Sequence, residues 1–386
     1  MGGNGSFFRS RWVEAPDAAD ELDPGRLAPG FRASGVACGL KPSGSPDLGI
    51  VVCDDAPAGS AALFTSNAAA AAPVRVTRER CRLGALRAVV VNSGNANAAT
   101  GAAGLADAGA MQERAAALLG LDPASVAVAS TGVIGVPLPM ERVEAGIDAA
   151  AAALSEEGGD DLAQAILTTD RGPKRCTVRA GGVTVSAQAK GAGMTQPGFA
   201  TMLCFVQTDA TLADPERTLR AAVAGSFERI TVDGQQSTND AVFLQASGLA
   251  GRELPRGLLA AVVLQLALDL VADGEGATRV GWVEISEAAT DEEAERVARA
   301  VANSPLVKTA FFGRDPNWGR VVQAAGMALA GEDVDLGPAD VDASELGVDA
   351  AEAEIAVRLG RGEAAAHVYF SDLTHAYVEL NAEYTT

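Results

Sequence analysis

The chain is poor in histidine. Among 386 residues there are only two, His367 and His375, and both lie near the C-terminal end. A Ser-His or Cys-His pair, or a histidine-rich metal site, would have to use one of them. We expect both to be structural or surface residues, so any acid-base chemistry must draw on another group.

Cysteine is also scarce and widely spaced. No C-x-x-C pair occurs among the five, Cys38, Cys53, Cys81, Cys176 and Cys204. This pattern predicts neither a disulfide framework nor a thiolate zinc site, and we expect no bound metal.

No apolar run is long enough to cross a bilayer. The longest, residues 258–272, is interrupted by Gln265 and Asp269 and predicts a buried amphipathic helix. Basic residues are few, 30 against 50 acidic ones, and the net charge of -20 disfavours nucleic acid and anionic membranes as partners. Residues 1–25 resemble neither a secretory signal nor a transit peptide, so we expect a cytoplasmic protein.

Strand-like and helix-like segments alternate, which predicts a mixed α/β (α+β) fold without tandem repeats. Helices are expected at 104–120, 140–154, 213–229, 255–272 and 291–302. Strands are expected at 48–55, 61–67, 86–94 and 125–130, as a hairpin at 174–190, near 279–287 and at the C-terminal end.

Thr201 opens an apolar strand in the stretch PGFATMLCF. A threonine at a new N-terminus has a free α-amine whose pKa of about 7.7–8 lets it take the hydroxyl proton at neutral pH. Attack of this hydroxyl on the Ala200 carbonyl would create that terminus, and nearby glycines (Gly191, Gly193, Gly198) would let the backbone bend. A simple turn leading into a buried strand fits the same spacing.

Three other stretches are candidates for the site. Ser130, Thr131 and Gly132 end a strand, and their backbone N–H groups and hydroxyls are suited to an oxyanion, although such turns are common. The Asn-rich residues 92–101 predict either a ligand-binding loop or a tight turn. Glu275, between two glycines, is either a ligand for an amino group or a solvated acid.

Together these segments resemble the ornithine acetyltransferases of arginine biosynthesis, also called glutamate N-acetyltransferases. The shared motifs, in the family's order, are NSGNANAATG, STGVIG, KGAGM with ATML, TVDGQQSTND, DGEGAT, SPLVKTAFFGRDPNWGR and NAEYTT. The resemblance extends from about residue 30 to the last residue.

The resemblance implies self-cleavage between Ala200 and Thr201 into an α-chain (1–200) and a β-chain (201–386). It implies Thr201 as the nucleophile and Thr131 with Gly132 as the oxyanion pair. The implied substrate-contacting residues are Thr168, Lys190, Thr201, Glu275, Asn381 and Thr386. The implied fold is a two-lobed N-terminal-nucleophile arrangement of paired sheets with flanking helices, assembled as a heterotetramer of two α-chains and two β-chains.

The activity implied is transfer of an acetyl group from N2-acetyl-L-ornithine to L-glutamate through an acyl-threonine, with no cofactor. Use of acetyl-CoA as a co-substrate stays open. Three alternatives also stay open: an amidase or aminopeptidase with the same nucleophile, a specialised paralogue in secondary metabolism, and an unprocessed binding protein.

Overall fold

The computed structural model describes residues 6–196 and 202–383. Its central strands are buried on both faces, which explains their nearly continuous apolar sequences. In β3 (Leu48–Cys53), Leu48, Ile50 and Val52 pack against helices, while Val51 and Cys53 face a second sheet. The same period-two division occurs in β5 (Ala88–Asn92).

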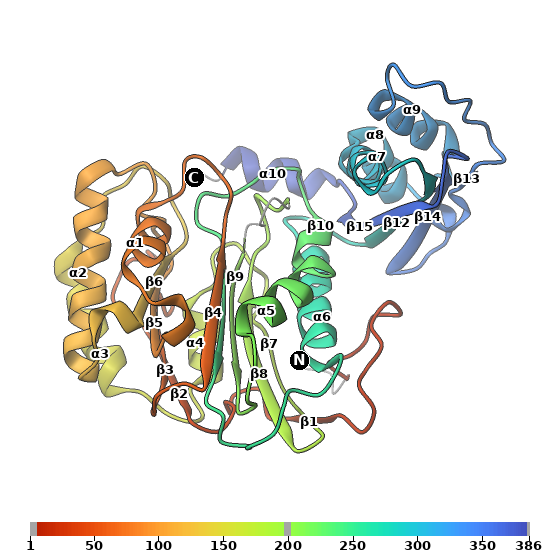
Figure 1. Cartoon of the computed structure of the whole chain (residues 1–386). Coiled ribbons are helices and arrows are strands. Elements are labelled where there is room, and N and C mark those ends of the chain that lie inside the picture. The colour runs from red at the N-terminus through yellow and green to blue at the C-terminus, as the bar shows by residue number, and fades with distance from the viewer. Residues whose placement is uncertain (1–5, 197–201, 384–386) are drawn as a thin grey trace.

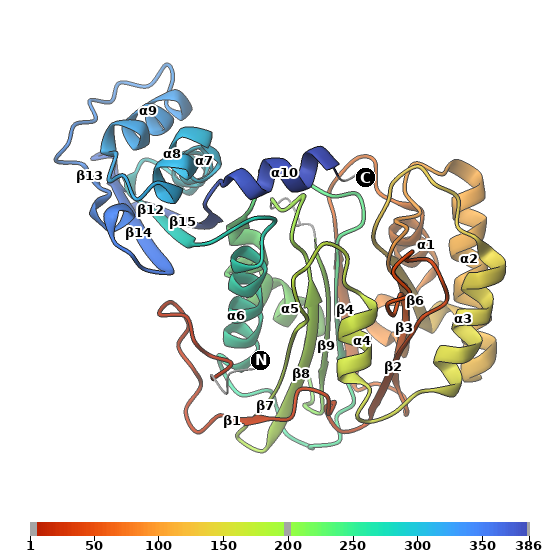
Figure 2. The same ribbon diagram turned by 180° about the vertical axis from the view of Figure 1, so that it is seen from behind.

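Two sheets lie between two layers of helices (Figures 1 and 2). The four-stranded sheet has the order β2-β3-β5-β6, completed by β2 (Phe31–Val36) and β6 (Val126–Ser130). The six-stranded sheet has the order β1-β7-β8-β9-β11-β4, with bounds β1 (Asp20–Leu22), β4 (Gly59–Phe64), β7 (Lys174–Ala180), β8 (Val183–Lys190), β9 (Leu203–Thr208) and β11 (Ala241–Ala246). Between the sheets, the rings of Phe205 and Phe243 stack with centroids 5.6 Å apart.

Helices cover the outer faces. On the four-stranded sheet lie α2 (Gly101–Leu119) and α3 (Met140–Ala152), and on the six-stranded sheet lie α5 (Pro215–Ala224) and α6 (Leu258–Ala272). Two shorter helices, α1 (Ala72–Arg80) and α4 (Gly159–Ala165), pack beside α2 and between the sheets, respectively. The result is a helix–sheet–sheet–helix arrangement.

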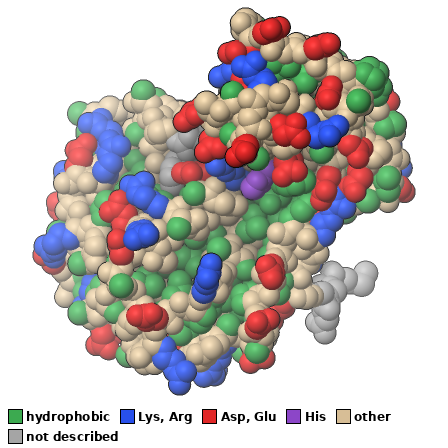
Figure 3. Space-filling model, turned by 45° about the vertical axis from the view of Figure 1, so that its right-hand side comes forward, with side chains coloured by type: hydrophobic (Ala, Val, Ile, Leu, Met, Phe, Trp, Pro, Cys, Tyr) green, Lys and Arg blue, Asp and Glu red, His purple; other side chains and the backbone are tan. Residues whose placement is uncertain are grey.

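A second unit with its own core projects from this body (Figure 1). Its sheet, ordered β10-β15-β12-β14-β13, comprises β10 (Ile230–Thr231), β12 (Val280–Ala288), β13 (Val341–Asp342), β14 (Glu352–Arg358) and β15 (Ala364–Ser371). Its helices are α7 (Asp291–Asn303), α8 (Pro305–Phe312) and α9 (Trp318–Ala328). Acidic side chains gather on this unit (Figure 3). The chain then returns over the main body as α10 (His375–Glu383).

The mixed α/β prediction is confirmed, with three local corrections. The helix expected at 213–229 ends at Ala224, and the C-terminal end forms helix α10 after its last strand. The buried helix expected at 258–272 is confirmed as α6, but it has no solvent-exposed polar face, because Gln265 and Asp269 are buried as well. The Gln265 side-chain oxygen accepts hydrogen bonds from the N–H groups of Arg9 and Ser10, so the N-terminal segment covers the polar face. No helix in the described ranges is long and apolar enough to span a membrane.

The strands on either side of residue 200 are neighbours. β8 pairs antiparallel with β9, with Lys190 opposite Leu203, and β9 pairs parallel with β11. Strands from before and after residue 200 therefore belong to one sheet. The end of β8 and the start of β9 lie side by side at the same end of these two strands.

Candidate active site

A cavity of about 220 Å³ brings together residues from distant parts of the chain. Among the residues expected at the site, those lining it are Thr131, Gly132, Thr168, Lys190, Glu275 and Asn381. The predictions for Ala200, Thr201 and Thr386 concern positions outside the described residues. Neither histidine lines the cavity: His367 packs between Trp282 and Tyr369, and His375 contacts Phe312.

Thr131 and Gly132 form a turn directly after β6. Gly132 has φ +132°, and a Cβ there would lie 2.4 Å from the Gly94 carbonyl carbon, so only glycine fits this close backbone approach. The Thr131 N–H donates to the Asn92 carbonyl oxygen, while its Oγ1 accepts from Lys190 Nζ at 3.2 Å. Because Thr131 Oγ1 accepts that bond, its own hydrogen is available to a ligand.

The Asn-rich loop, residues 92–101, supports this turn through hydrogen bonds to the residues on either side of it. Asn92 Oδ1 accepts from the Ser130 hydroxyl at 2.6 Å, and Asn95 Nδ2 donates to the Val136 carbonyl oxygen at 3.0 Å. Asn97 Nδ2 donates to the Gly104 carbonyl oxygen. These amides bond within the protein, which favours the structural interpretation of the loop over direct ligand binding.

Asn239 links this support to the other side of the cavity. Its Nδ2 donates to the carbonyl oxygens of Ala96 and Ser130 at 2.6 and 2.9 Å. The residue is 5% exposed and precedes β11. One amide therefore bridges the ends of two sheets beside Thr131.

Glu275 lines the cavity from a loop after α6. Its Oε1 accepts from the Thr169 hydroxyl and its Oε2 from Asn381 Nδ2, each at 2.8 Å. A Cβ on Gly193 would lie 2.7 Å from this carboxyl group, so the glycine permits the approach. Gly276 has the same role toward Tyr377 of α10, and the C-terminal helix is thereby held over the cavity. Val378 and Leu380 of the same helix are 62% and 49% exposed, so docking depends on Tyr377 and Asn381.

One loop, residues 231–240, holds both flanks of the 197–201 segment. On one side, the Asp233 carboxylate accepts from the N–H groups of Met194 and Thr195 at 2.6 and 2.8 Å. On the other, Asp240 Oδ1 accepts from the Met202 N–H at 2.9 Å. Burial raises the pKa of both carboxyl groups, that of Asp240 well above its usual range, and Asp240 Oδ2 has no hydrogen-bond partner among the described residues.

Lys190 is 5% exposed and reaches the cavity from the end of β8. The pKa of Lys190 is lowered from its ordinary value, above all by burial, and nearby carboxylates, chiefly that of Asp170, offset this lowering only in part. The cavity is lined by both the Lys190 amino group and the Glu275 carboxylate, which suits a small molecule that carries a carboxylate and an amino group. No group of three or more His, Cys, Asp or Glu side chains suited to a metal occurs in the part of the chain that the structure describes.

Several lining residues were not assigned a role from the sequence. Asp233 and Asn239 lie in the stretch 231–242, which is noticeable for its Gly, Asn and Asp content but gives no indication of its partners. Thr169, which lines the cavity, and Asp170, which does not, directly follow the expected Thr168. Their contacts with Glu275 and Gly191 could not be predicted from the sequence.

Comparison with known proteins gives matches along nearly the whole chain. The model of the ArgJ family matches residues 32–386. The arginine biosynthesis bifunctional protein ArgJ of Symbiobacterium thermophilum is 46% identical over 399 residues, covering 95% of this chain and 99% of the relative. Its counterpart from Geobacter sulfurreducens is 45% identical over 393 residues, covering 92% and 99%.

Among solved structures, ornithine acetyltransferase from Mycobacterium tuberculosis in complex with ornithine is 41% identical. That match covers 48% of this chain and 100% of the solved chain, with a TM-score of 0.44. The extent of the family match and the identity to full-length relatives establish that the chain belongs to the ArgJ family of arginine-biosynthesis enzymes.

Proposed function

We propose that this protein transfers an acetyl group from N2-acetyl-L-ornithine to L-glutamate. The observation that carries the proposal is the convergence of Thr131, Gly132, Lys190 and Glu275 on one small cavity. Both substrates are amino acids with a carboxylate and a basic nitrogen, and the cavity offers charges of both signs to such molecules. Family membership supports the same reaction.

In this proposal Thr201 is the nucleophile. Its hydroxyl oxygen attacks the acetyl carbonyl of acetylornithine, and its α-amine takes the hydroxyl proton. The amide C–N bond breaks, and that proton leaves with ornithine. The glutamate amine then attacks the threonine ester and forms the new amide C–N bond, the ester C–O bond breaks, and the proton lost by the amine passes to the Thr201 oxygen and restores the hydroxyl.

Thr131 and Gly132 are proposed to stabilise the tetrahedral intermediates of both steps. The Thr131 hydroxyl is polarised by the hydrogen bond that its oxygen accepts from Lys190. Replacing Thr131 by Val keeps the side chain's shape and removes the donor, so kcat should fall about 10²–10³-fold. Thr168, Glu275, Asn381 and Thr386 are proposed to contact the substrates.

We further propose that the α-amine of Thr201 is produced by self-cleavage after Ala200, giving chains 1–200 and 201–386. Support comes from the shared loop that holds Thr195 and Met202, which flank the bond. The hydrogen bonds between β8 and β9 would keep the two chains together after the cut. A cytoplasmic heterotetramer of two α-chains and two β-chains is proposed from the family resemblance, and native mass spectrometry would test the assembly.

Intact-mass analysis of the purified protein tests the cleavage directly. We expect two masses that divide at residue 201, and Thr201→Ala should give one uncut, inactive chain. Full-length protein that is nevertheless active would contradict the proposal.

The acceptor distinguishes transfer from hydrolysis. Ornithine release from acetylornithine should require glutamate, whereas release without glutamate would indicate an amidase. The same assay with acetyl-CoA and glutamate, followed by measuring free CoA, tests the proposed use of acetyl-CoA as a second donor.

A further inference from the structure

Lysine is almost absent from the protein surface. The thirty basic residues include only four lysines, Lys41, Lys174, Lys190 and Lys308. Lys174, Lys190 and Lys308 are 5%, 5% and 4% exposed, and Lys41 is half-buried. Lysine is rarely buried unless it is paired, so each of these positions requires a compensating group.

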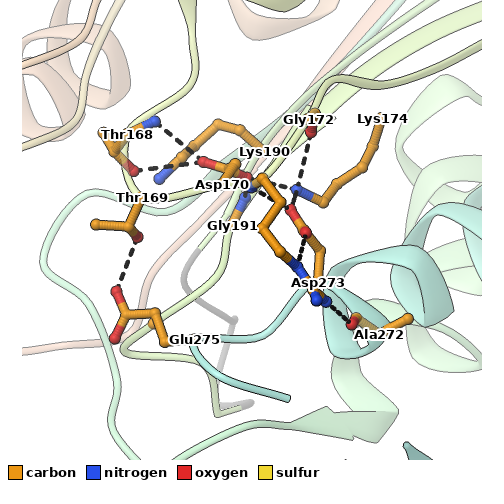
Figure 4. Close-up of polar contacts among 12 residues, drawn as sticks. Thr168, Thr169, Asp170, Gly172, Lys174, Lys190, Gly191, Ala272, Asp273 and Glu275 are labelled. Carbon is orange, nitrogen blue, oxygen red and sulfur yellow. Dashed lines mark hydrogen bonds and ion pairs between the residues drawn. The ribbon is translucent and has the colours of Figure 1, made fainter. Parts of the chain in front are cut away.

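Asp170 pairs with Lys174 and lies beside Lys190 (Figure 4). Its side chain is fully buried, and its Oδ1 accepts from Lys174 Nζ at 2.6 Å and from the Gly191 N–H at 2.8 Å. Its Oδ2 accepts from the Thr168 N–H at 3.0 Å. Burial raises the pKa of Asp170, but the ammonium groups of Lys190 and Lys174 outweigh it and hold the pKa well below its usual range.

The two lysines have unequal access to other anions. Lys174 also pairs with Asp273, which in turn pairs with Arg171 at 2.8 Å. Lys190 has no ion pair within 4.0 Å among the described residues, and its Nζ donates to Thr131 Oγ1. In Figure 4, Lys174 and Lys190 lie on opposite sides of Asp170.

The charge of Lys190 therefore depends on a small set of neighbours. Asp170, Asp240 and Glu275 favour its ammonium form, while burial and Lys174 oppose it. The pKa of Lys41 is also influenced by both Lys190, which lowers it, and Asp170, which raises it, although burial lowers it most. Among the carboxylates, Asp170 acts most strongly, and it is itself shared with Lys174.

We propose that Asp170 is a positioning residue that keeps the Lys190 side chain charged and directed at Thr131, and that Lys174 weakens this effect by competing for the same carboxylate. The proposal rests on the proposed function only in that Thr131 and Lys190 serve the reaction. The carboxylate of Asp170 does not line the cavity. It accepts from the N–H of Gly191, the residue directly after Lys190, and lies beside the Lys190 side chain in Figure 4, so its influence on the cavity passes through Lys190.

Opposite effects are expected from the two partners. Asp170→Asn keeps the shape and an acceptor for the Gly191 N–H but removes the charge, so the pKa of Lys190 should move down. Lys174→Gln removes the competing cation, so the pKa of Lys190 should move up. If Asp170 and Lys174 only stabilised the fold, there would be no reason for the two substitutions to shift the pKa of Lys190 in opposite directions.

The small number of lysines makes the measurement direct. Protein labelled with [ε-13C]lysine should give one side-chain signal per lysine, and each signal can be followed by NMR across neutral and alkaline pH without substrate. Lys308→Met assigns one signal and is the matched control, because this buried lysine lies in the C-terminal unit and should leave the Lys190 titration unchanged.

Activity provides a second readout. The pH at which kcat/KM for acetyl transfer declines on the alkaline side should move down in Asp170→Asn and up in Lys174→Gln, and Asp170→Glu should return it toward the wild-type value. If Asp170→Asn does not fold, the Lys174→Gln and Asp170→Glu titrations still decide. Shifts of the Lys190 signal in the same direction in Asp170→Asn and Lys174→Gln, or no shift, would overturn the proposal, whether or not the protein transfers acetyl groups.

Discussion

Asn239→Ala tests the support behind the candidate oxyanion turn. The change removes an amide that is 5% exposed and that donates to the carbonyl oxygens of Ala96 and Ser130 at 2.6 and 2.9 Å. Leaving a buried acceptor unpaired costs about 1–3 kcal/mol. The substitution leaves two carbonyl oxygens without this donor. Because Asn239 lines the cavity, water can enter the space left by its side chain and should recover part of the lost hydrogen-bond energy. We expect the free energy of unfolding to fall by about 2–4 kcal/mol.

Thermal unfolding measures this cost. At about 2 °C per kcal/mol for a large domain, Tm should fall by roughly 4–8 °C. Gln235→Ala is the matched control, because Gln235 lines the same cavity but is exposed, and within residues 6–196 and 202–383 its side chain bonds only to the Asp233 carbonyl oxygen, at 3.4 Å. The control should change stability by less than about 0.5 kcal/mol.

The same variant should impair chemistry more than binding. Ser130 precedes Thr131, so releasing its carbonyl allows the turn to move, and kcat should fall with less change in KM. An Asn239→Ala protein with the Tm and kcat of Gln235→Ala would refute the reasoning that this amide holds the turn in place.

Three further predictions concern other parts of the molecule. Gly193→Ala places a Cβ 2.7 Å from the Glu275 carboxyl group and should displace it from Thr169 and Asn381; we expect KM for acetylornithine to rise about tenfold, the equivalent of 1.4 kcal/mol, and an unchanged KM would contradict a substrate-binding role for Glu275. Burial lowers the pKa of Lys308 to about 7, below its unfolded value of about 10.4, so the unfolded state binds more protons between these values. The stabilisation from the neutral Lys308 side chain is fully present above the unfolded-state pKa and is lost as the pH falls toward the folded-state pKa. Tm measured between these two pKa values should depend less on pH in Lys308→Met than in the wild type. An equal dependence of Tm on pH in both proteins would argue against the lowered pKa. Phe243→Ala removes a fully buried ring stacked on Phe205 and should cost about 3–5 kcal/mol in chemical denaturation, whereas Leu249→Ala, at a side chain that is 59% exposed, should cost little; equal losses would mean that the core between the sheets is not well packed.

Local sequence patterns predicted the mixed α/β class and many of the helices and strands, but not helix α10. Alternation in β3 and β5 follows directly from strand geometry, and the glycines at 132 and 193 mark positions where no side chain fits. The motifs also indicated Thr131, Lys190 and Glu275, which the fold brings to one cavity. Helix α6 shows the limit of this approach, since its polar residues are buried by a segment more than two hundred positions away.

Tertiary structure alone decided which groups control one another. Asn239 reaches Ala96 across 143 positions because the packing of the two sheets brings their ends together. Glu275 reaches Thr169 across 106 positions because α6, which it follows, packs on the sheet that contains β7, which Thr169 precedes. No periodicity or motif encodes such pairings, since each partner's local pattern reflects only its own strand or turn. The sequence determined that Asp170, Lys174 and Lys190 are charged residues near a turn and a hairpin. Only their burial around one carboxylate, where water cannot screen them, makes the charge of Lys190 depend on the other two.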